Sequence, residues 1–169
     1  MAGQVLGSGF QFVIRSLLGG ELLFPDLQAR VDAMDGAAWY DWGEYVAATK
    51  GIAEVLVEAT IVHVGQEIML TARPLLEQQG FASPEALLGD WRRVFESNVR
   101  GLDESQLPVT IAATDGRATV DYGVELPPAL VEGYLRGAVL MFGRRVESFT
   151  RTVVSSNGHD RLRCTVAWR

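Results

Sequence analysis

Two histidines and one cysteine are the first places to look for chemistry in this 169-residue sequence. His63 and Glu67 are four residues apart, so a helical segment would bring them together on one face. His63 also follows Leu56 and Ala59 at helical spacing, so we expect it to share the apolar face of its helix. An imidazole beside a carboxylate can act as a general base or as part of a ligand site near neutral pH. A metal site needs three or four protein ligands, and no other His or Cys is placed to supply them. The alternative is a hydrogen-bonded histidine at the edge of the core, and both interpretations stay open.

The remaining histidine and the cysteine have simpler explanations. His159 follows Asn157-Gly158, which is typical of a tight turn where polar side chains are solvated. Cys164 alternates with Leu162 and Val166, which indicates a small core residue and not a reactive thiolate. A single cysteine also excludes an internal disulfide and a zinc cluster built from cysteines.

Motifs that would hold a nucleotide or form a catalytic triad are missing. Gly7-Ser8-Gly9 lacks the third glycine and the downstream acid of a dinucleotide site. The sequence contains no P-loop, no G-x-S-x-G and no H-E-x-x-H pattern. Arg92, Arg93 and Arg100 could hold an anion or could simply form a solvated face. We therefore expect a binding module and not an enzyme, with no catalytic residue, no metal ligand and no cofactor assigned.

The densest aromatic cluster offers a different kind of site. It lies in the first third of the chain and consists of Trp39, Tyr40, Trp42 and Tyr45. Such side chains could line an apolar ligand pocket, anchor an interface, or close the core where a helix begins. Adding the other residues singled out by the sequence, the candidates for a ligand pocket are Trp39, Trp42, Tyr45, His63, Glu67 and Tyr122.

Composition narrows the class of protein. Apolar residues make up 48% of the chain and charged residues 21%, which is typical of a packed globular domain. The formal net charge is -6, and no run of Lys or Arg forms a basic patch, so nucleic acid is not an expected partner. No apolar stretch approaches the ~20 residues of a membrane span. We expect one cytoplasmic domain over residues 1–169, with no membrane partner.

The first part of the chain, residues 1–101, is predicted to be helical because apolar residues recur every three or four positions. The helix starts and stops are marked by capping residues, prolines and glycines. The pattern predicts helices from Ser8 to about Leu18, after Pro25, after the cap Asp41, from Gly51 towards Pro74 with a bend at Gly65, and from Ser83 to about Gly101.

The second part, residues 107–169, changes to a period of two. Alternating apolar residues flank Asp115-Gly116 and Asn157-Gly158, which predicts two hairpins. Between them, Pro127-Pro128 opens a helix that Gly143 ends, and Gly133 and Gly137 should let its backbone approach the sheet. The predicted fold class is α+β, with the helical N-terminal part packed on a C-terminal β-β-α-β-β antiparallel sheet. We expect a pocket at their boundary, near residues 101–106.

This order of elements, together with the string from Tyr122 to Gly143, resembles the heme-nitric oxide/oxygen-binding (H-NOX) superfamily and its 4-vinyl-reductase-like relatives. The chain is also similar to myxobacterial proteins of this fold in three stretches: the aromatic run 39–42, the helix segment 133–137 and the last strand 166–168. The resemblance implies a bacterial sensor domain. In the superfamily a Tyr-x-Ser-x-Arg motif and a proximal histidine hold the heme.

The heme motif is not kept here. Tyr122 matches the tyrosine of the motif, but Val124 stands at the serine position and Leu126 at the arginine position. Residues 94–102, where the proximal histidine is expected, contain no histidine. The resemblance therefore implies a heme-free relative.

These observations lead to one hypothesis and two alternatives. We expect a non-catalytic sensor or signalling module that binds a small apolar ligand or a protein partner between its helical part and its sheet. One alternative is a structural or scaffolding homodimer. The other is an enzyme acting on a tetrapyrrole or another flat apolar substrate, which rests on the resemblance to 4-vinyl-reductase-like proteins alone.

Overall fold

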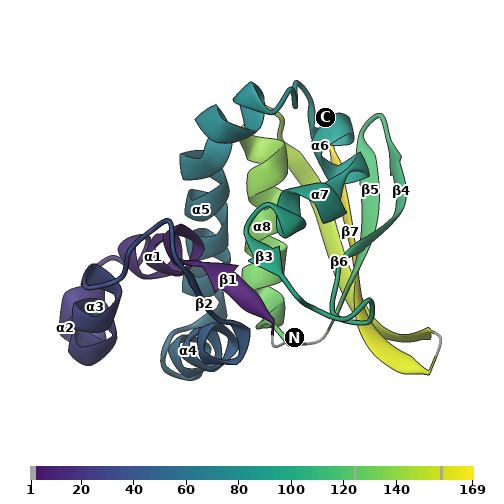
Figure 1. Cartoon of the computed structure of the whole chain (residues 1–169). Helices are drawn as coiled ribbons and strands as arrows, with labels where there is room; N and C mark the ends of the chain where they lie inside the picture. Colours follow the sequence, from purple (N-terminus) through teal and green to yellow (C-terminus); the bar gives the residue numbers. More distant parts are fainter. Residues whose placement is uncertain (1–2, 124, 157) are drawn as a thin grey trace.

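A four-stranded antiparallel sheet forms one side of the molecule in the computed structural model, which describes residues 3–123, 125–156 and 158–169 (Figure 1). The strand order is β4-β5-β7-β6. The bounds of the strands are Val109–Thr114 for β4, Arg117–Gly123 for β5, Val146–Ser156 for β6 and His159–Trp168 for β7. With α8 (Pro128–Leu140) between β5 and β6, the predicted β-β-α-β-β order and the α+β fold class are confirmed.

The two predicted hairpins are both present. Gly116 adopts a φ of 79° in the turn between β4 and β5, and Gly158 a φ of 78° between β6 and β7. These left-handed conformations favour glycine, which explains the turn signals in the sequence. Asn157 lies outside the described residues.

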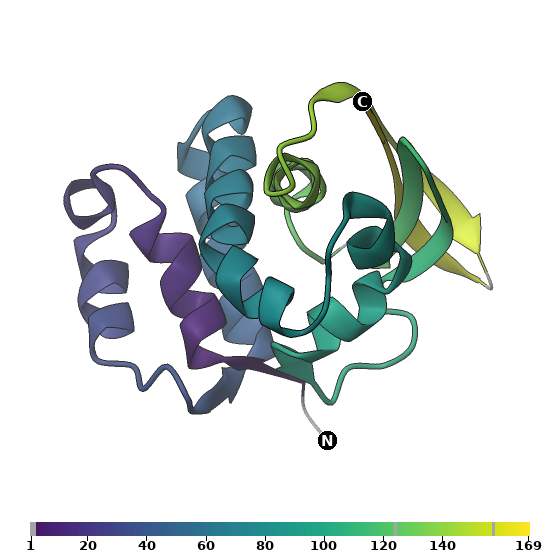
Figure 2. The same ribbon diagram turned by 90° about the horizontal axis from the view of Figure 1, so that it is seen from above.

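The two faces of the sheet differ as the alternation predicted. Leu162, Cys164, Val166 and Trp168 of β7 are all buried on the inner face, against α8. The outer face carries polar side chains such as Thr119 and Thr165, whose hydroxyls are 2.9 Å apart across neighbouring strands. This face has no helix over it in the part of the chain that the structure describes (Figure 2).

The central layer is a pair of helices in close contact. Helix α5 (Glu58–Gln78) lies beside α8, and α8 separates it from the sheet (Figures 1 and 2). A Cβ atom on Gly133 would lie 2.3 Å from the carbonyl oxygen of Val62, and one on Gly137 would lie 2.7 Å from Cβ of Met69. The glycines of α8 therefore allow α5 to pack closely against it. The expectation that they allow the close approach of the sheet is wrong.

The other helices cover the remaining apolar surface. Their bounds are Gly7–Arg15 for α1, Gly20–Leu23 for α2, Pro25–Asp32 for α3, Trp42–Val55 for α4, Pro84–Gly89 for α6 and Trp91–Glu96 for α7. Two predicted caps are confirmed, because Asp41 accepts a hydrogen bond from the Glu44 amide at 2.9 Å and Ser83 accepts one from the Ala86 amide at 3.2 Å.

Three helix boundaries differ from the prediction. The first helix begins at Gly7 with no side-chain cap, so Ser8 is not its cap. The chain stays helical through Gly51 because Ile52 must reach the core, and the break falls where Leu56 and Val57 are extended. Pro74 lies inside α5 and does not end it.

The predicted helix from Ser83 to Gly101 is also wrong. It divides at Asp90, whose backbone leaves the helical region and turns the chain. This turn lets Leu87 and Leu88 of α6 and Trp91 of α7 all be buried, which one straight helix would not achieve. The chain then enters strand β3 (Val99–Arg100).

A small sheet in the helical part was not predicted. It has the order β2-β1-β3, with β1 at Gln4–Leu6 and β2 at Trp39–Asp41. Strands of two or three residues are too short to show an alternating pattern. The sheet joins the N-terminus to the segment after α7, because Val5 pairs with both Tyr40 and Val99. No helix of the described chain has the length and apolar character that crossing a membrane requires.

We predict that Gly133→Ala lowers the free energy of unfolding by about 3 kcal/mol, because the added methyl group has no space between α8 and α5. Gly51→Ala is the matched control: it is also helical, has no atom within 4 Å of the new Cβ, and should gain up to about 1 kcal/mol. Urea denaturation of both variants measures the difference. Equal effects of the two substitutions would contradict the close helix contact.

Candidate functional site

An apolar cavity of about 170 Å³ lies between the helical part and the sheet part of the molecule. Its wall comes from α1, α4, α5, α7, β5 and α8, with one residue each from β1 and β3. The apolar side chains of the wall are Val5, Phe12, Trp42, Ile68, Met69, Ala72, Leu75, Leu76, Trp91, Val94, Phe95, Val99 and Leu126.

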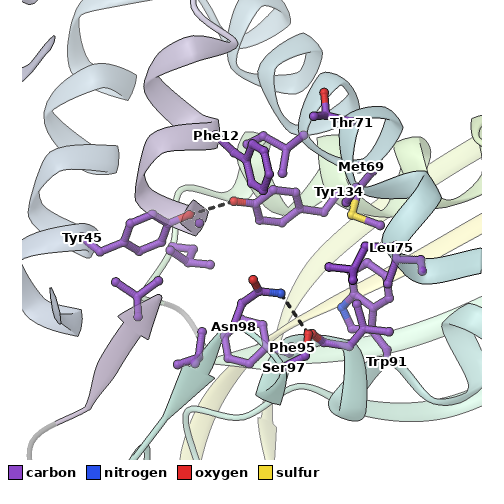
Figure 3. Close-up of a pocket in the computed structure, with 18 of the residues that line it drawn as sticks. Phe12, Tyr45, Met69, Thr71, Leu75, Trp91, Phe95, Ser97, Asn98 and Tyr134 are labelled. Atoms are coloured by element: carbon purple, nitrogen blue, oxygen red, sulfur yellow. Dashed lines mark hydrogen bonds between the residues drawn. The ribbon is translucent and has the colours of Figure 1, made fainter. Parts of the chain in front are cut away.

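A pair of tyrosines spans one side of the cavity. The hydroxyls of Tyr45 on α4 and Tyr134 on α8 are 2.9 Å apart, and in Figure 3 the two rings point at each other. Burial raises the pKa of Tyr45 to about 12, although its hydrogen bond to Tyr134 works in the opposite direction. Burial likewise raises the pKa of Tyr134 well above 10. Both phenols are therefore neutral at physiological pH.

Two further hydrogen bonds fasten aromatic side chains of the wall. The indole N–H of Trp42 donates to a carboxylate oxygen of Glu125 at 2.6 Å, and the other oxygen of Glu125 accepts from Gln106 at 2.8 Å. The indole N–H of Trp91 donates to the hydroxyl of Tyr122. Each bond joins a helix of the first part to the sheet part, so both parts hold the cavity wall in place.

The rings of the wall also contact one another. The centroids of Trp42 and Phe95 are 5.9 Å apart with planes at 77°, and those of Phe95 and Tyr122 are 6.3 Å apart at 84°. Edge-to-face pairs of this kind stabilise aromatic clusters. On the other side of Trp42, the ring of Tyr45 is 5.3 Å away. Aromatic rings thus form a continuous path from α4 to β5.

The cavity opens to solvent between α5 and the segment after α7. Thr71, Leu75 and Ser97 line it and are exposed, and Asn98 is half-buried (Figure 3). The amide of Asn98 donates to the hydroxyl of Ser97 at 3.0 Å. Small molecules can therefore reach the apolar wall past a few polar side chains.

Half of the predicted pocket residues line this cavity. Trp42, Tyr45 and Tyr122 contribute to its wall. Trp39 does not: it belongs to β2, and the guanidinium of Arg100 lies 4.2 Å from the centre of its ring.

His63 and Glu67 also lie away from the cavity. Their side chains are 53% and 42% exposed, and the imidazole is 4.0 Å from the carboxylate. The prediction that His63 shares the apolar face of its helix is wrong, because the buried face of α5 is set by Gly65 and its contact with α8. The two side chains do meet on one face, but it is the solvent face.

The other residues that the sequence suggested for a chemical role are explained by their burial, exposure or ion pairs. His159 is exposed in the hairpin. Cys164 is buried, and burial raises the pKa of its thiol to about 12, which disfavours a thiolate. Arg92 is held by Glu96 and Glu104, and Arg93 by Asp90, so neither offers a free charge for an anion.

The pocket predicted near residues 101–106 has a different character from the apolar cavity. Asp103, Glu104 and Ser105 border an open hollow beside β4 and β7, whose wall mixes the charged Asp121 and Arg161 with Val109 and Ile111. The guanidinium of Arg161 donates to backbone carbonyls of Ser105, Leu107 and Asp121, so it fastens this loop to the sheet. Within the described ranges, no group of three or more His, Cys, Asp or Glu could hold a metal ion.

Several residues of the wall were missed by the sequence analysis. Tyr134 lies within the string that carries the H-NOX resemblance, but nothing in its spacing shows that it meets Tyr45. On α5, Ile68, Ala72 and Leu75 lie at positions i, i+4 and i+7 and form one stripe that faces the cavity. The sequence could have predicted this stripe, because Leu75 is an apolar residue for which the sequence analysis named no partner in the core.

Comparison with known proteins reveals the fold. No model of a protein family and no curated protein matches the chain. Solved structures do match: an oxygen-binding H-NOX domain related to soluble guanylate cyclases has a TM-score of 0.65 and 13% identity, covering 95% of this chain and 92% of that one. A mutant T. tengcongensis H-NOX domain has a TM-score of 0.64 at 13% identity, covering 96% and 95%. An S. oneidensis H-NOX protein in the Fe(II)NO state has 0.62 at 15% identity, covering 97% and 99%. The chain has the fold of H-NOX domains.

The residues of the cavity do not fit a heme. No His, Cys, Lys or Arg is among the described residues that line it, so imidazole and thiolate ligands and the counter-charges for propionates are missing there. Met69 offers a thioether sulfur, but in cytochromes c such a sulfur ligates the iron together with a histidine. Tyr45 and Tyr134 could ligate iron only as phenolates, which their burial opposes. A volume of about 170 Å³ is also close to that of a cavity that holds benzene, about 150 Å³, and far smaller than a macrocycle of four pyrrole rings requires.

We predict that the protein loses stability between pH 10 and 12 through its buried phenols. The ordinary pKa of tyrosine is 10.0, while that of Tyr45 is raised to about 12. Because the unfolded chain ionises first, the stabilisation is fully present below pH 10 and is lost as the pH rises towards 12. Urea denaturation across this range measures the slope.

The double variant Tyr45→Phe/Tyr134→Phe should give a shallower loss than the parent, since two of the buried phenols are removed. Tyr40→Phe serves as the control, because the Tyr40 hydroxyl lies outside the cavity and accepts from the Asp35 amide. A slope that is the same in the parent and in the double variant would show that these phenols do not carry the effect.

Proposed function

We propose that the chain is a non-catalytic sensor or signalling module that binds a small apolar molecule in this cavity without a heme. The observation that carries the proposal is the combination of an apolar wall with a volume of about 170 Å³. An enclosed apolar cavity of about 150 Å³ binds benzene, so the apolar wall here offers comparable space to a ligand. A cavity of about this volume would therefore gain contacts from a ligand about the size of benzene.

Binding in this place would be communicated to the rest of the molecule. The wall is shared between α4 and α5 on one side and β5 and α8 on the other. A ligand that fills the cavity therefore contacts both parts at once, and it favours the arrangement in which both walls touch it. The output would be a changed surface for a protein partner.

The chemistry of the wall supports a binding role over catalysis. Apart from Tyr45, Tyr122 and Tyr134, none of the described residues that line the cavity titrates. Burial raises the pKa of all three. A neutral phenol is a poor general base, so the site holds no group poised to accept a proton near pH 7. A flat tetrapyrrole substrate, like a heme, is too large for a cavity of this volume.

We predict that Ala72→Leu weakens the binding of benzene by about tenfold or more, equal to about 1.4 kcal/mol, because the larger side chain fills the space that benzene would occupy. Ala59→Leu is the matched control: Ala59 lies on the same helix but is exposed and does not line the cavity. Ligand-observed NMR titrations of the parent and both variants measure the dissociation constants. Equal affinity in all three proteins would place benzene elsewhere.

A structural homodimer is the second candidate, and one observation favours it. Leu18, Leu22 and Leu23 are exposed at the corner of α1 and α2, with Leu18 at 89% and Leu22 at 82%. Apolar side chains gathered in this way commonly mark contact surfaces. In Figure 1 this corner lies at the far end of the helical part from the sheet, so a second copy could bind there without covering the cavity.

Native mass spectrometry together with an absorption spectrum separates these possibilities. We expect the protein from a heme-supplemented host to show no Soret band. Its native mass spectrum should show a monomer, either with a small molecule bound or with an empty cavity. A dimer that is lost in Leu18→Ser/Leu22→Ser would favour the scaffolding function. A Soret band with one heme per chain would contradict the heme-free proposal.

A further inference from the structure

The hydrogen-bond donors around the cavity outnumber the acceptors that the protein offers them. The indole N–H groups of Trp42 and Trp91 are both used, on Glu125 and on Tyr122. The hydroxyl of Tyr122 accepts in this bond, and its own hydrogen has no acceptor among the residues that the structure describes. Buried hydroxyls normally have a partner for this hydrogen.

The tyrosine pair holds a second unused hydrogen. Each hydroxyl carries one hydrogen, and the bond between Tyr45 and Tyr134 uses only one of the two. Whichever phenol donates, the other keeps an O–H that no side chain or carbonyl of the described chain accepts. Both rings line the cavity, as Figure 3 shows.

We propose that the ligand is a neutral, ring-sized molecule with a carbonyl-type oxygen, and that this oxygen accepts the free O–H of the Tyr45–Tyr134 pair. Small ketones, aldehydes and quinones belong to this class. The proposal rests on the proposed function, since it names the chemistry of the ligand for the same cavity. An apolar ring fills the wall, and one acceptor satisfies a donor that is otherwise left without a partner.

Charge excludes the closest alternatives. A carboxylate would need a cation, and no Lys, Arg or His is among the described lining residues. A protonated amine would need a carboxylate, but Glu125 is already held by Trp42 and Gln106. Asn98 at the mouth offers both a donor and an acceptor, so it does not select between classes.

Single and double substitutions of the tyrosine pair leave different numbers of free hydroxyl hydrogens. Tyr134→Phe removes one hydroxyl but leaves that of Tyr45, whose hydrogen is then free, so the number of unused donors in the pair stays at one. Only Tyr45→Phe/Tyr134→Phe removes the donor altogether. The double variant is therefore the substitution that tests the donor.

The experiment compares cyclohexanone with methylcyclohexane, which share a six-membered ring and differ in the acceptor, by ligand-observed NMR titration. We expect the double variant to raise the dissociation constant of cyclohexanone about 3- to 10-fold, the range of one neutral hydrogen bond, and to leave that of methylcyclohexane within about twofold. The external control Tyr40→Phe should change neither probe beyond about twofold, because its hydroxyl lies outside the cavity.

The possible outcomes separate this inference from the proposed function. If the double variant leaves cyclohexanone unchanged, or weakens both probes equally, the acceptor inference is wrong while an apolar ligand site stands. If neither probe nor benzene binds the parent protein, the proposed function itself is wrong. Cyclohexanecarboxylate gives a further check, because tight binding of this anion in the cavity would overturn the choice of a neutral ligand.

Discussion

The close contact between α5 and α8 is the constraint on which the rest of the structure depends. Gly65 and Gly133 meet so closely that a Cβ atom on Gly65 would lie 2.8 Å from the Cα atom of Gly133. One turn later along α8, Gly137 lets the same approach continue beside Gln66 and Met69. Because the two helices touch along these turns, the next stretch of α5 is brought beside Tyr134 and the aromatic wall. The cavity lies beside this contact: Tyr134, between the two glycines of α8, and Met69, which packs against Gly137, both line it.

The aromatic side chains determine how much of that space remains. This chain places Trp42, Trp91, Phe95 and Tyr122 around the cavity. Their edge-to-face contacts and the indole hydrogen bonds hold each ring in a fixed position. Rings held in this way cannot easily move aside for a larger ligand. The small volume of the cavity therefore follows from the packing of specific side chains. The cavity is not simply a loosely packed region of the core.

The sequence predicted the elements that local patterns define, and missed those that depend on long-range contacts. The hairpins, α8 and two caps were predicted because glycine turns, a double proline, Asp41 and Ser83 act on their immediate neighbours. The small sheet of β1, β2 and β3 was missed because its strands are short and its pairing joins residues up to 96 positions apart, as between Gln4 and Arg100. The division of the predicted helix at Asp90 was likewise decided by burial, and the local pattern gave no sign of it.

The candidate site shows the same limit more sharply. Trp42, Tyr45 and Tyr122 could be proposed as pocket residues because aromatic residue types suggest it, yet the hydrogen bond from Tyr45 to Tyr134 joins residues 89 positions apart. His63 was the more obvious chemical candidate, but the helix turns it to solvent because Gly65 must face α8. Residue type alone thus favoured the imidazole, whereas the geometry favours two phenols that are poor acids and poor bases. A site built from such groups can recognise shape and one acceptor atom but has little means to transfer a proton, so the physical chemistry of this wall favours recognition over reaction.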